Sequence, residues 1–170
     1  MESADDITRA HSAVIDKVAS LSHEEATERP DPSVWTVLEC LEHIVVTNLA
    51  VFRFVSSDQS GKSETDVEEL IPRDRMKRAL HNRDRKYQAP EPIRPTGRFK
   101  TLQEAVDQLQ WIRTQFGEFL SKHPTVNRAT WDHPFLGAMT KKDWLHFVVD
   151  HTERHTFQID EILSRCRTKQ

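Results

Sequence analysis

Two histidines spaced four positions apart are the residues of this chain best suited to chemistry. His151 and His155 lie in a segment whose apolar periodicity predicts a helix, residues 140–163. Four residues advance a helix by slightly more than one turn, so both imidazoles project from one face, roughly 6 Å apart at Cβ. At this spacing the two rings can bind one transition-metal ion. Two ligands hold a metal poorly, so a third ligand must come from elsewhere in the chain.

His43 is the best candidate for the third ligand. It lies within a second predicted helix, residues 36–55, which is apolar around most of its girth and should be the most buried element. If this helix and the last one are neighbours, three neutral imidazoles converge on one interior point. Three nitrogen ligands leave positions open for water or substrate, as in catalytic rather than structural metal sites. Imidazoles suit Zn²⁺, Ni²⁺, Fe²⁺ or Co²⁺, and the order of affinities does not choose among them.

Simpler interpretations exist for these histidines, and the others do not join the group. A histidine pair four apart on a helix is often solvated or hydrogen-bonded without a metal, and a single histidine on an apolar face is often a satisfied core residue. Polar faces or loops are predicted for His11, His23 and His81. His123 precedes a proline at a helix end, and His146 lies on another side of the last helix.

His133 and three further side chains are candidates for assisting a metal site. His133 lies in a predicted loop, residues 131–137, which leads into the last helix. This position could bring it to the mouth of the site as a proton shuttle, and the alternative is an ordinary loop imidazole beside a proline. A ligating imidazole needs an acceptor at its other nitrogen. Asp150, Thr47 and Gln158 are near enough in sequence to serve, although Asp150 alternatively faces solvent.

The elements that must position these residues are helices. Apolar residues recur at three- and four-residue steps in four long segments, three of which begin with a capping box: residues 5–21, 36–55, 101–122 and 140–163. A shorter polar helix is predicted at residues 73–87. We expect no strands.

The connection between the second and third long helices is more than forty residues long. Its proline-rich part, residues 89–95, should run extended over the surface. A connection of this length lets consecutive helices run parallel, as in bundles with a crossover. The sequence therefore predicts an all-α fold: one domain over residues 1–170, a four-helix bundle with a long crossover connection.

The composition excludes several classes of protein. Charged residues make up 30% of the 170 residues, but the net charge is −3 without a long block of one sign, so no nucleic-acid partner is expected. The most basic stretch, residues 73–78, is interrupted by Asp74 and is interpreted as a solvated helix face rather than a phosphate-binding patch. No apolar segment is long enough for a membrane span, and the acidic N-terminus lacks a signal-peptide pattern. Cys40 lies in an apolar run and Cys166 near the polar tail, without a disulfide framework, so a reducing cytoplasm is the default location.

Two ordered sequence motifs surround the three candidate ligands. In the first, Trp35 precedes a helix cap and His43 follows on the helix; in the second, His151 and His155 are followed by a Gln-Ile pair. Together they resemble the DinB-like superfamily of metal-binding four-helix bundles, and the resemblance spans nearly the whole chain. It implies that His43, His151 and His155 bind a divalent metal, with water completing the coordination.

Three hypotheses of function follow. Members of the superfamily include S-transferases and isomerases that use low-molecular-weight thiols such as bacillithiol or mycothiol. The leading hypothesis is therefore a metal-dependent transferase that activates such a thiol for attack on a small-molecule substrate. The second is a metal-dependent hydrolase with His133 or Asp150 as general base. The third is a non-catalytic, stress-linked bundle whose metal only ties helices together. Relatives dimerise, so a homodimer is expected, and Trp35 and Trp144 are interpreted as core residues rather than substrate stackers.

Overall fold

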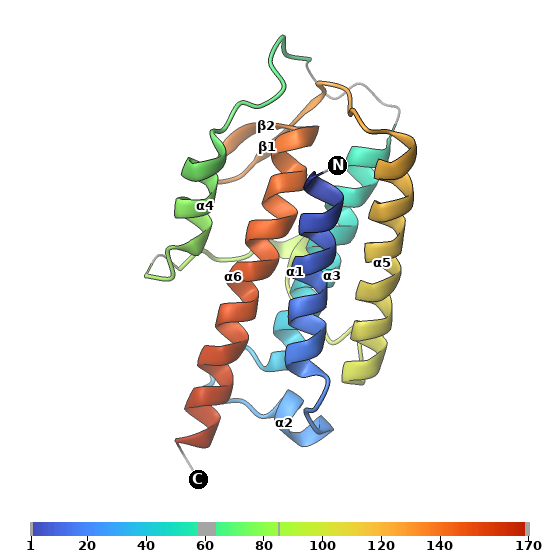
Figure 1. Cartoon of the computed structure of the whole chain (residues 1–170). Coiled ribbons are helices and arrows are strands. Elements are labelled where there is room, and N and C mark those ends of the chain that lie inside the picture. Colours follow the sequence, from blue (N-terminus) through green and yellow to red (C-terminus); the bar gives the residue numbers. More distant parts are fainter. Residues whose placement is uncertain (1, 58–63, 85, 169–170) are drawn as a thin grey trace.

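The structure, a computed structural model, describes residues 2–57, 64–84 and 86–168 and is mainly helical (Figure 1). In chain order the elements are α1 (Glu2–Val18), α2 (His23–Thr27), α3 (Val37–Ser56), α4 (Arg73–His81), the 3₁₀ turn η1 (Glu91–Ile93), α5 (Leu102–Lys122), β1 (Thr130–His133), β2 (Gly137–Thr140) and α6 (Lys141–Arg167). The long helices α1, α3, α5 and α6 form the predicted bundle, and the two strands add a small hairpin at one end.

The bundle places α3 next to α6. α3 packs against α6 and α5, and α1 packs against the same two helices, so α1 and α3 lie on one diagonal. α3 and α5 run in the same direction, because the connection between them returns along the length of the bundle (Figure 1). This is the crossover arrangement that the long connection predicts.

The interior is filled by the apolar stripes of the four long helices. Side chains without exposed surface come from each of them: Ile7, Val14, Leu41, Ile44, Leu109, Ile112, Phe116, Val148 and Ile159. Burial of such side chains is the main favourable term in folding, at about 25 cal/mol per Å² of apolar surface. The stripes predicted from three- and four-residue spacing therefore do form the core.

Capping boxes fix where the long helices begin. The Thr36 hydroxyl accepts the Glu39 N–H at 3.1 Å, and the Glu39 carboxylate accepts the Thr36 N–H at 2.8 Å. The same reciprocal arrangement opens α5 at Thr101 and α6 at Thr140. Each cap satisfies backbone donors that the first helical turn leaves without partners. Because the cap fixes the start of α3, it also fixes the side of the helix from which the His43 side chain projects.

The prediction that the chain contains no strands is wrong, because a hairpin precedes α6. β1 and β2 pair in antiparallel register, and Gly137 at φ +82° provides the left-handed residue that completes the turn. The imidazole of His133 accepts the backbone N–H groups of Phe135 and Leu136, both at 3.1 Å. Strands of four residues are too short to show alternation, and an imidazole that holds a turn has no sequence signature.

Three further boundaries and burials differ from the predictions. α4 ends at His81 rather than at residue 87, because Arg154 of α6 binds the carbonyl groups of Leu80 and Asn82 and withdraws them from the helix. α1 begins at Glu2 and ends at Val18, and the short α2 follows it. Cys166 is buried within α6 rather than lying on a polar tail, whereas Cys40 is buried as predicted.

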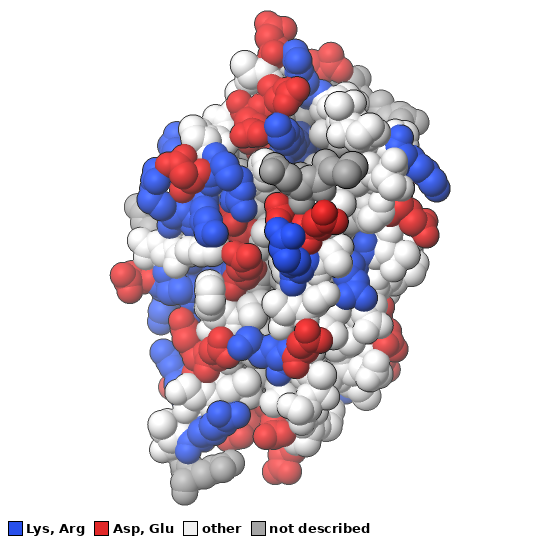
Figure 2. All heavy atoms as spheres, in the orientation of Figure 1, with Lys and Arg blue, Asp and Glu red and all other residues white. Residues whose placement is uncertain are grey.

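The surface carries mixed charge. Figure 2 shows acidic and basic side chains interspersed over one face, with Lys and Arg gathered most closely over α4. Two of these basic residues already have acidic partners, Arg78 with Asp74 at 2.6 Å and Arg73 with Asp150. The interpretation of this stretch as a helix face rather than a phosphate-binding patch agrees with these contacts. Among the described residues, no helix combines the length and apolar character that crossing a membrane requires.

Candidate metal centre

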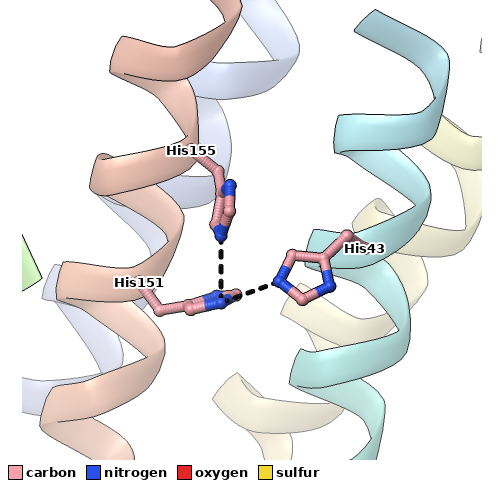
Figure 3. A group of neighbouring side chains, drawn as sticks. All are labelled: His43, His151 and His155. Atoms are coloured by element: carbon pink, nitrogen blue, oxygen red, sulfur yellow. Dashed lines mark hydrogen bonds between the residues drawn. The ribbon is translucent and has the colours of Figure 1, made fainter. Parts of the chain in front are cut away.

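Three histidines from two distant parts of the chain converge between α3 and α6 (Figure 3). The Nε2 atom of His151 lies 3.1 Å from Nε2 of His43 and 3.1 Å from Nε2 of His155. One ligand atom from each ring lies within 4.8 Å of the other two. The structure thus brings together all three residues that the sequence selects as metal ligands.

Hydrogen bonds on the outer nitrogens determine which nitrogen faces the centre in two of the three rings. The Nδ1 of His43 lies 2.8 Å from the Ile93 carbonyl oxygen, and the Nδ1 of His155 lies 2.8 Å from the Gln158 amide oxygen. Carbonyl oxygens only accept hydrogen bonds, so both Nδ1 atoms carry the proton and both Nε2 lone pairs point inward. Gln158 therefore makes the contact predicted for it, whereas Ile93 was not foreseen.

The third ring, that of His151, has no such partner. Among the residues that the structure describes, its buried Nδ1 has no hydrogen-bond partner, and neither has the buried hydroxyl of Thr47, one turn beyond His43 on α3. The predicted bond from Thr47 to a ligating imidazole is not made. Phe147 stacks on the His151 ring instead, with the ring centroids 4.9 Å apart.

Burial keeps the three imidazoles neutral. His43, His151 and His155 are 4%, 6% and 7% exposed. Burial lowers the pKa of His43, and it lowers the pKa of His151 and His155 well below the usual range, with the neighbouring imidazoles adding to the effect. Neutral imidazole is the form that binds metals, so the lone pairs are available at neutral pH.

The walls of the group are aromatic and apolar. The indole of Trp35 is half-buried and lies 5.0 Å from the His43 ring and 6.4 Å from the His155 ring, measured between centroids. Trp35 is thus beside the site rather than in the core, whereas Trp144 is a core residue as predicted, 4% exposed. The thiol of Cys40 lies 3.7 Å from Nδ1 of His155, and burial raises its pKa to about 12, so it remains protonated.

The donor set fits a divalent transition-metal ion. Nitrogen ligands at the usual Zn–N distance from a tetrahedral ion lie about 3.3 Å apart, close to the 3.1 Å separations here. At least two of the three inward nitrogens bear lone pairs and no proton, an arrangement that favours a cation between them. Three ligands leave a coordination position for a further molecule.

Comparison with known proteins identifies the family. The family model described as DinB superfamily matches residues 6–159. The chain belongs to the DinB superfamily. It is 22% identical over 148 residues to the uncharacterized protein YuaE of Bacillus subtilis (strain 168), a match that covers 86% of this chain and 88% of YuaE. Its fold is similar to the crystal structure of TT2238, a four-helix bundle protein, with a TM-score of 0.60, 18% identity, and coverage of 94% and 97% of the two chains.

His133 of this DinB-superfamily protein lies near the group but is already engaged. Its Nδ1 accepts two backbone N–H groups of the hairpin turn, and burial lowers its pKa to about 4. Its ring lies 5.0 Å from the ring of Phe147, which also contacts His151. With Nδ1 occupied, the neutral ring keeps its proton on Nε2 and can donate there, but it is poorly suited to accept a proton.

Asp150 lies on α6 next to His151, but its side chain faces away from the three histidines. The alternative that it faces solvent is wrong, because it is fully buried. Both of its oxygens bind the guanidinium of Arg73 on α4, the longer contact being 2.8 Å. With His81 and Glu153 it forms a second cluster of potential ligands in this DinB-superfamily chain. His81 is therefore at a helix–helix contact and not on a polar face.

His11 is the histidine whose environment the sequence interpretation missed most clearly. It is fully buried, and its Nε2 lies 2.9 Å from the Asn48 amide nitrogen, which also donates to Thr152 at 3.2 Å. The signal was present, since His11 continues the spacing from Ile7 to Val14 along the buried stripe of α1.

Proposed function

We propose that His43, His151 and His155 bind one divalent transition-metal ion, Zn²⁺, Ni²⁺, Fe²⁺ or Co²⁺, and that the protein transfers a low-molecular-weight thiol to a small-molecule electrophile. The observation that carries the proposal is the convergence of three Nε2 atoms within 4.8 Å, with two ring tautomers fixed from outside. When bound, such an ion supplies a Lewis acid that lowers the pKa of a thiol.

The chain's own residues hold and enclose the reacting groups. The three imidazoles supply uncharged donors, so an ion keeps most of its positive charge and its attraction for a thiol sulfur. Trp35 and Phe147 pack against the rings and present apolar surfaces on which an organic electrophile can rest. Apolar walls around a few convergent polar groups are typical of small-molecule sites.

Two contacts favour thiol transfer over hydrolysis. Hydrolysis benefits from a base that removes a proton from water, and the two candidate bases are engaged: His133 by the hairpin turn and Asp150 by Arg73. A thiol, with a pKa of about 8.5, needs far less help to ionise than water does. In the proposed reaction the sulfur forms a bond to the electrophilic carbon, the leaving group departs with the bonding electrons, and the thiol proton passes to solvent.

The proposal extends to the setting of the protein. Low-molecular-weight thiols are kept reduced in the cytoplasm, where we expect the protein to act. Assembly as a homodimer is proposed from the family resemblance, and light scattering at several protein concentrations tests it.

The test begins with protein purified without a nickel column. Elemental analysis identifies the ion, and each of the four metals is then added back to metal-free protein. Conjugation of monochlorobimane is followed with bacillithiol, mycothiol or glutathione. We expect turnover with one of these thiols and none for His155→Ala, whereas the control His146→Ala, on the same helix beside Glu69, keeps it.

Three other results of these experiments would contradict the proposed thiol transfer. Turnover of esters or amides without any thiol would support the hydrolase. Metal binding that raises the melting temperature, with no turnover in either assay, would support the non-catalytic bundle. Negligible metal in both the wild type and His155→Ala would remove all the metal-dependent hypotheses.

A further inference from the structure

Glu42, the residue before His43, has a buried carboxylate that is not among the candidate metal ligands. It is 1% exposed. Its oxygens accept the backbone N–H groups of Thr96 at 2.7 Å, Gly97 at 3.1 Å and Arg98 at 3.1 Å. A buried carboxylate is tolerated only when hydrogen bonds satisfy it, and charged acceptors make the stronger bonds. Glu42 therefore attaches residues 96–98 of the crossover firmly to α3.

The turn that receives the carboxylate depends on Gly97. Three successive N–H groups can point at one anion only if the backbone curves, and Gly97 has φ +76°. A residue with a Cβ is strained in this left-handed region. The nearest atom to a Cβ placed on Gly97 is 4.0 Å away, so an alanine there would strain the backbone without a clash.

The attached turn lies three residues after Ile93, whose carbonyl fixes His43. Ile93 ends the turn η1, in which its N–H donates to the Pro90 carbonyl at 3.1 Å. Pro95 restricts the backbone between Ile93 and the turn at Thr96. Pro95 therefore limits how far the turn can move relative to the Ile93 carbonyl.

Adjacent residues on a helix point about 100° apart, so Glu42 and His43 bind two different parts of the crossover connection between α3 and α5. One accepts three N–H groups from it, and the other donates to its Ile93 carbonyl. We propose that Glu42 is a positioning residue for the metal centre: by anchoring the crossover it keeps the Ile93 carbonyl where it holds His43 with Nε2 turned toward His151. The role in metal binding rests on the proposed function, whereas the role in fixing the ring does not.

The test compares Glu42 with Asp143, a second buried carboxylate that holds a loop on a helix and also accepts the Thr140 N–H in the α6 capping box. Asp143 is fully buried and accepts the N–H groups of Leu70 and Ile71 at 2.9 and 3.3 Å, two turns before His151. Co²⁺ binding to metal-free protein is titrated by visible absorption for the wild type, Glu42→Gln and Asp143→Asn. We expect the dissociation constant to rise about 10-fold for Glu42→Gln, the low end for an outer-shell partner because Glu42 acts through Ile93, and to stay within about twofold for Asp143→Asn.

A second measurement does not require a metal. Long-range ¹H–¹⁵N spectra of the metal-free protein report the tautomer of each ring. We expect His43 to be protonated at Nδ1 in the wild type and Asp143→Asn, and to become a mixture of tautomers in Glu42→Gln. If the wild type fails to bind Co²⁺, the proposed function fails, but these spectra still decide the role of Glu42.

Unchanged Co²⁺ affinity together with an unchanged His43 tautomer in Glu42→Gln would overturn the proposal. So would equal losses in Glu42→Gln and Asp143→Asn, because general loosening would then explain both. Should Glu42→Gln not fold, Gly97→Ala replaces it, since it keeps the carboxylate and strains only the turn. The same two changes, smaller in size, are expected for Gly97→Ala, and their absence in a folded protein contradicts the anchoring role.

Discussion

Asp150 and His151 are neighbours on α6, yet they belong to two clusters with opposite electrostatics. Asp150 joins His81 and Glu153 on the side that faces α4, and there the chain supplies its own cation, Arg73. His81 Nε2 also lies 3.2 Å from the Glu153 carboxylate. Arg73 thus neutralises the fully buried carboxylate of this cluster, that of Asp150.

His151 joins His43 and His155 on the side that faces α3, and burial keeps these three imidazoles neutral. Both clusters have enough donor atoms for a metal. The comparison teaches that the number of donor atoms does not by itself distinguish a metal site. The charges of the groups that already surround those donors must also be considered. A guanidinium neutralises the buried carboxylate of one cluster, whereas inward lone pairs of the other are available to a cation from outside.

The largest effect is expected from removing a ligand of the histidine cluster. His151→Ala should reduce bound metal from about one ion per chain to less than a tenth, because two neutral nitrogens hold a divalent ion poorly. His81→Ala, which removes a donor from the other cluster, should leave the metal content unchanged. Elemental analysis of both variants after dialysis measures this, and equal metal loss in the two would erase the distinction between the clusters.

A smaller effect, on stability alone, is expected from removing the internal cation. Arg73→Met leaves the Asp150 carboxylate buried without its partner and should lower the free energy of unfolding by about 3 kcal/mol. This is the low end for a broken buried pair, because 35% of the Arg73 side chain is exposed. Urea denaturation of metal-free protein gives the value. A variant that binds less metal but unfolds like the wild type would reverse the roles assigned to the two clusters.

Acid should destabilise the metal-free protein through imidazoles that are buried without a counter-charge, and His11 is the clearest case. Burial, with a contribution from Arg113, lowers its pKa from 6.5 to about 3. The unfolded chain therefore binds the proton first, so stability is full above pH 6.5 and is lost as the pH falls toward 3. Between pH 7 and pH 5 the loss from His11 is about 2 kcal/mol.

Urea melts at a series of pH values test this, with His11→Gln as the comparison because glutamine can still accept from Asn48. We expect a shallower decline in the variant. Parallel declines in the two proteins would mean that His11 is not a source of the acid sensitivity.

The smallest effect is expected at the outer nitrogen of a ligand. Gln158→Leu removes the acceptor from His155 Nδ1 and should weaken metal binding about 10-fold while the fold is retained. Gln158→Glu restores an acceptor and should recover most of the affinity. Competition with a chromogenic chelator measures both variants, and a leucine variant that binds as tightly as the wild type would show that the tautomer of His155 is fixed by other contacts.

Local sequence signals were sufficient for the bundle and for its three candidate ligand residues. Capping boxes at Thr36, Thr101 and Thr140 mark helix starts, and the spacing of His151 and His155 places them on one face whatever the partner helix is. The expected burial of its helix made His43 the best third candidate, and the motifs that resemble the DinB superfamily supported that choice.

Features that depend on tertiary contact were not predictable in this way. The Ile93 carbonyl lies 50 residues from His43, and Arg73 lies 77 residues from Asp150, so neither partner follows from a local pattern. The hairpin before α6 is held by a histidine where turn residues such as asparagine or aspartate are the usual signal. By contrast, the burial of His11 was readable from its spacing, and counting histidine as polar concealed it.

The two halves of the histidine group lie 108 residues apart in the chain, from His43 to His151. An unfolded polypeptide would have to close a loop of that length to offer all three nitrogens, at an entropic penalty of about 4.7 kcal/mol. Before folding, only His151 and His155 lie close together in the chain, and two imidazoles hold a metal poorly. An ion that needs all three nitrogens would therefore bind only to chains that have already folded, so bound metal would report a correctly folded protein.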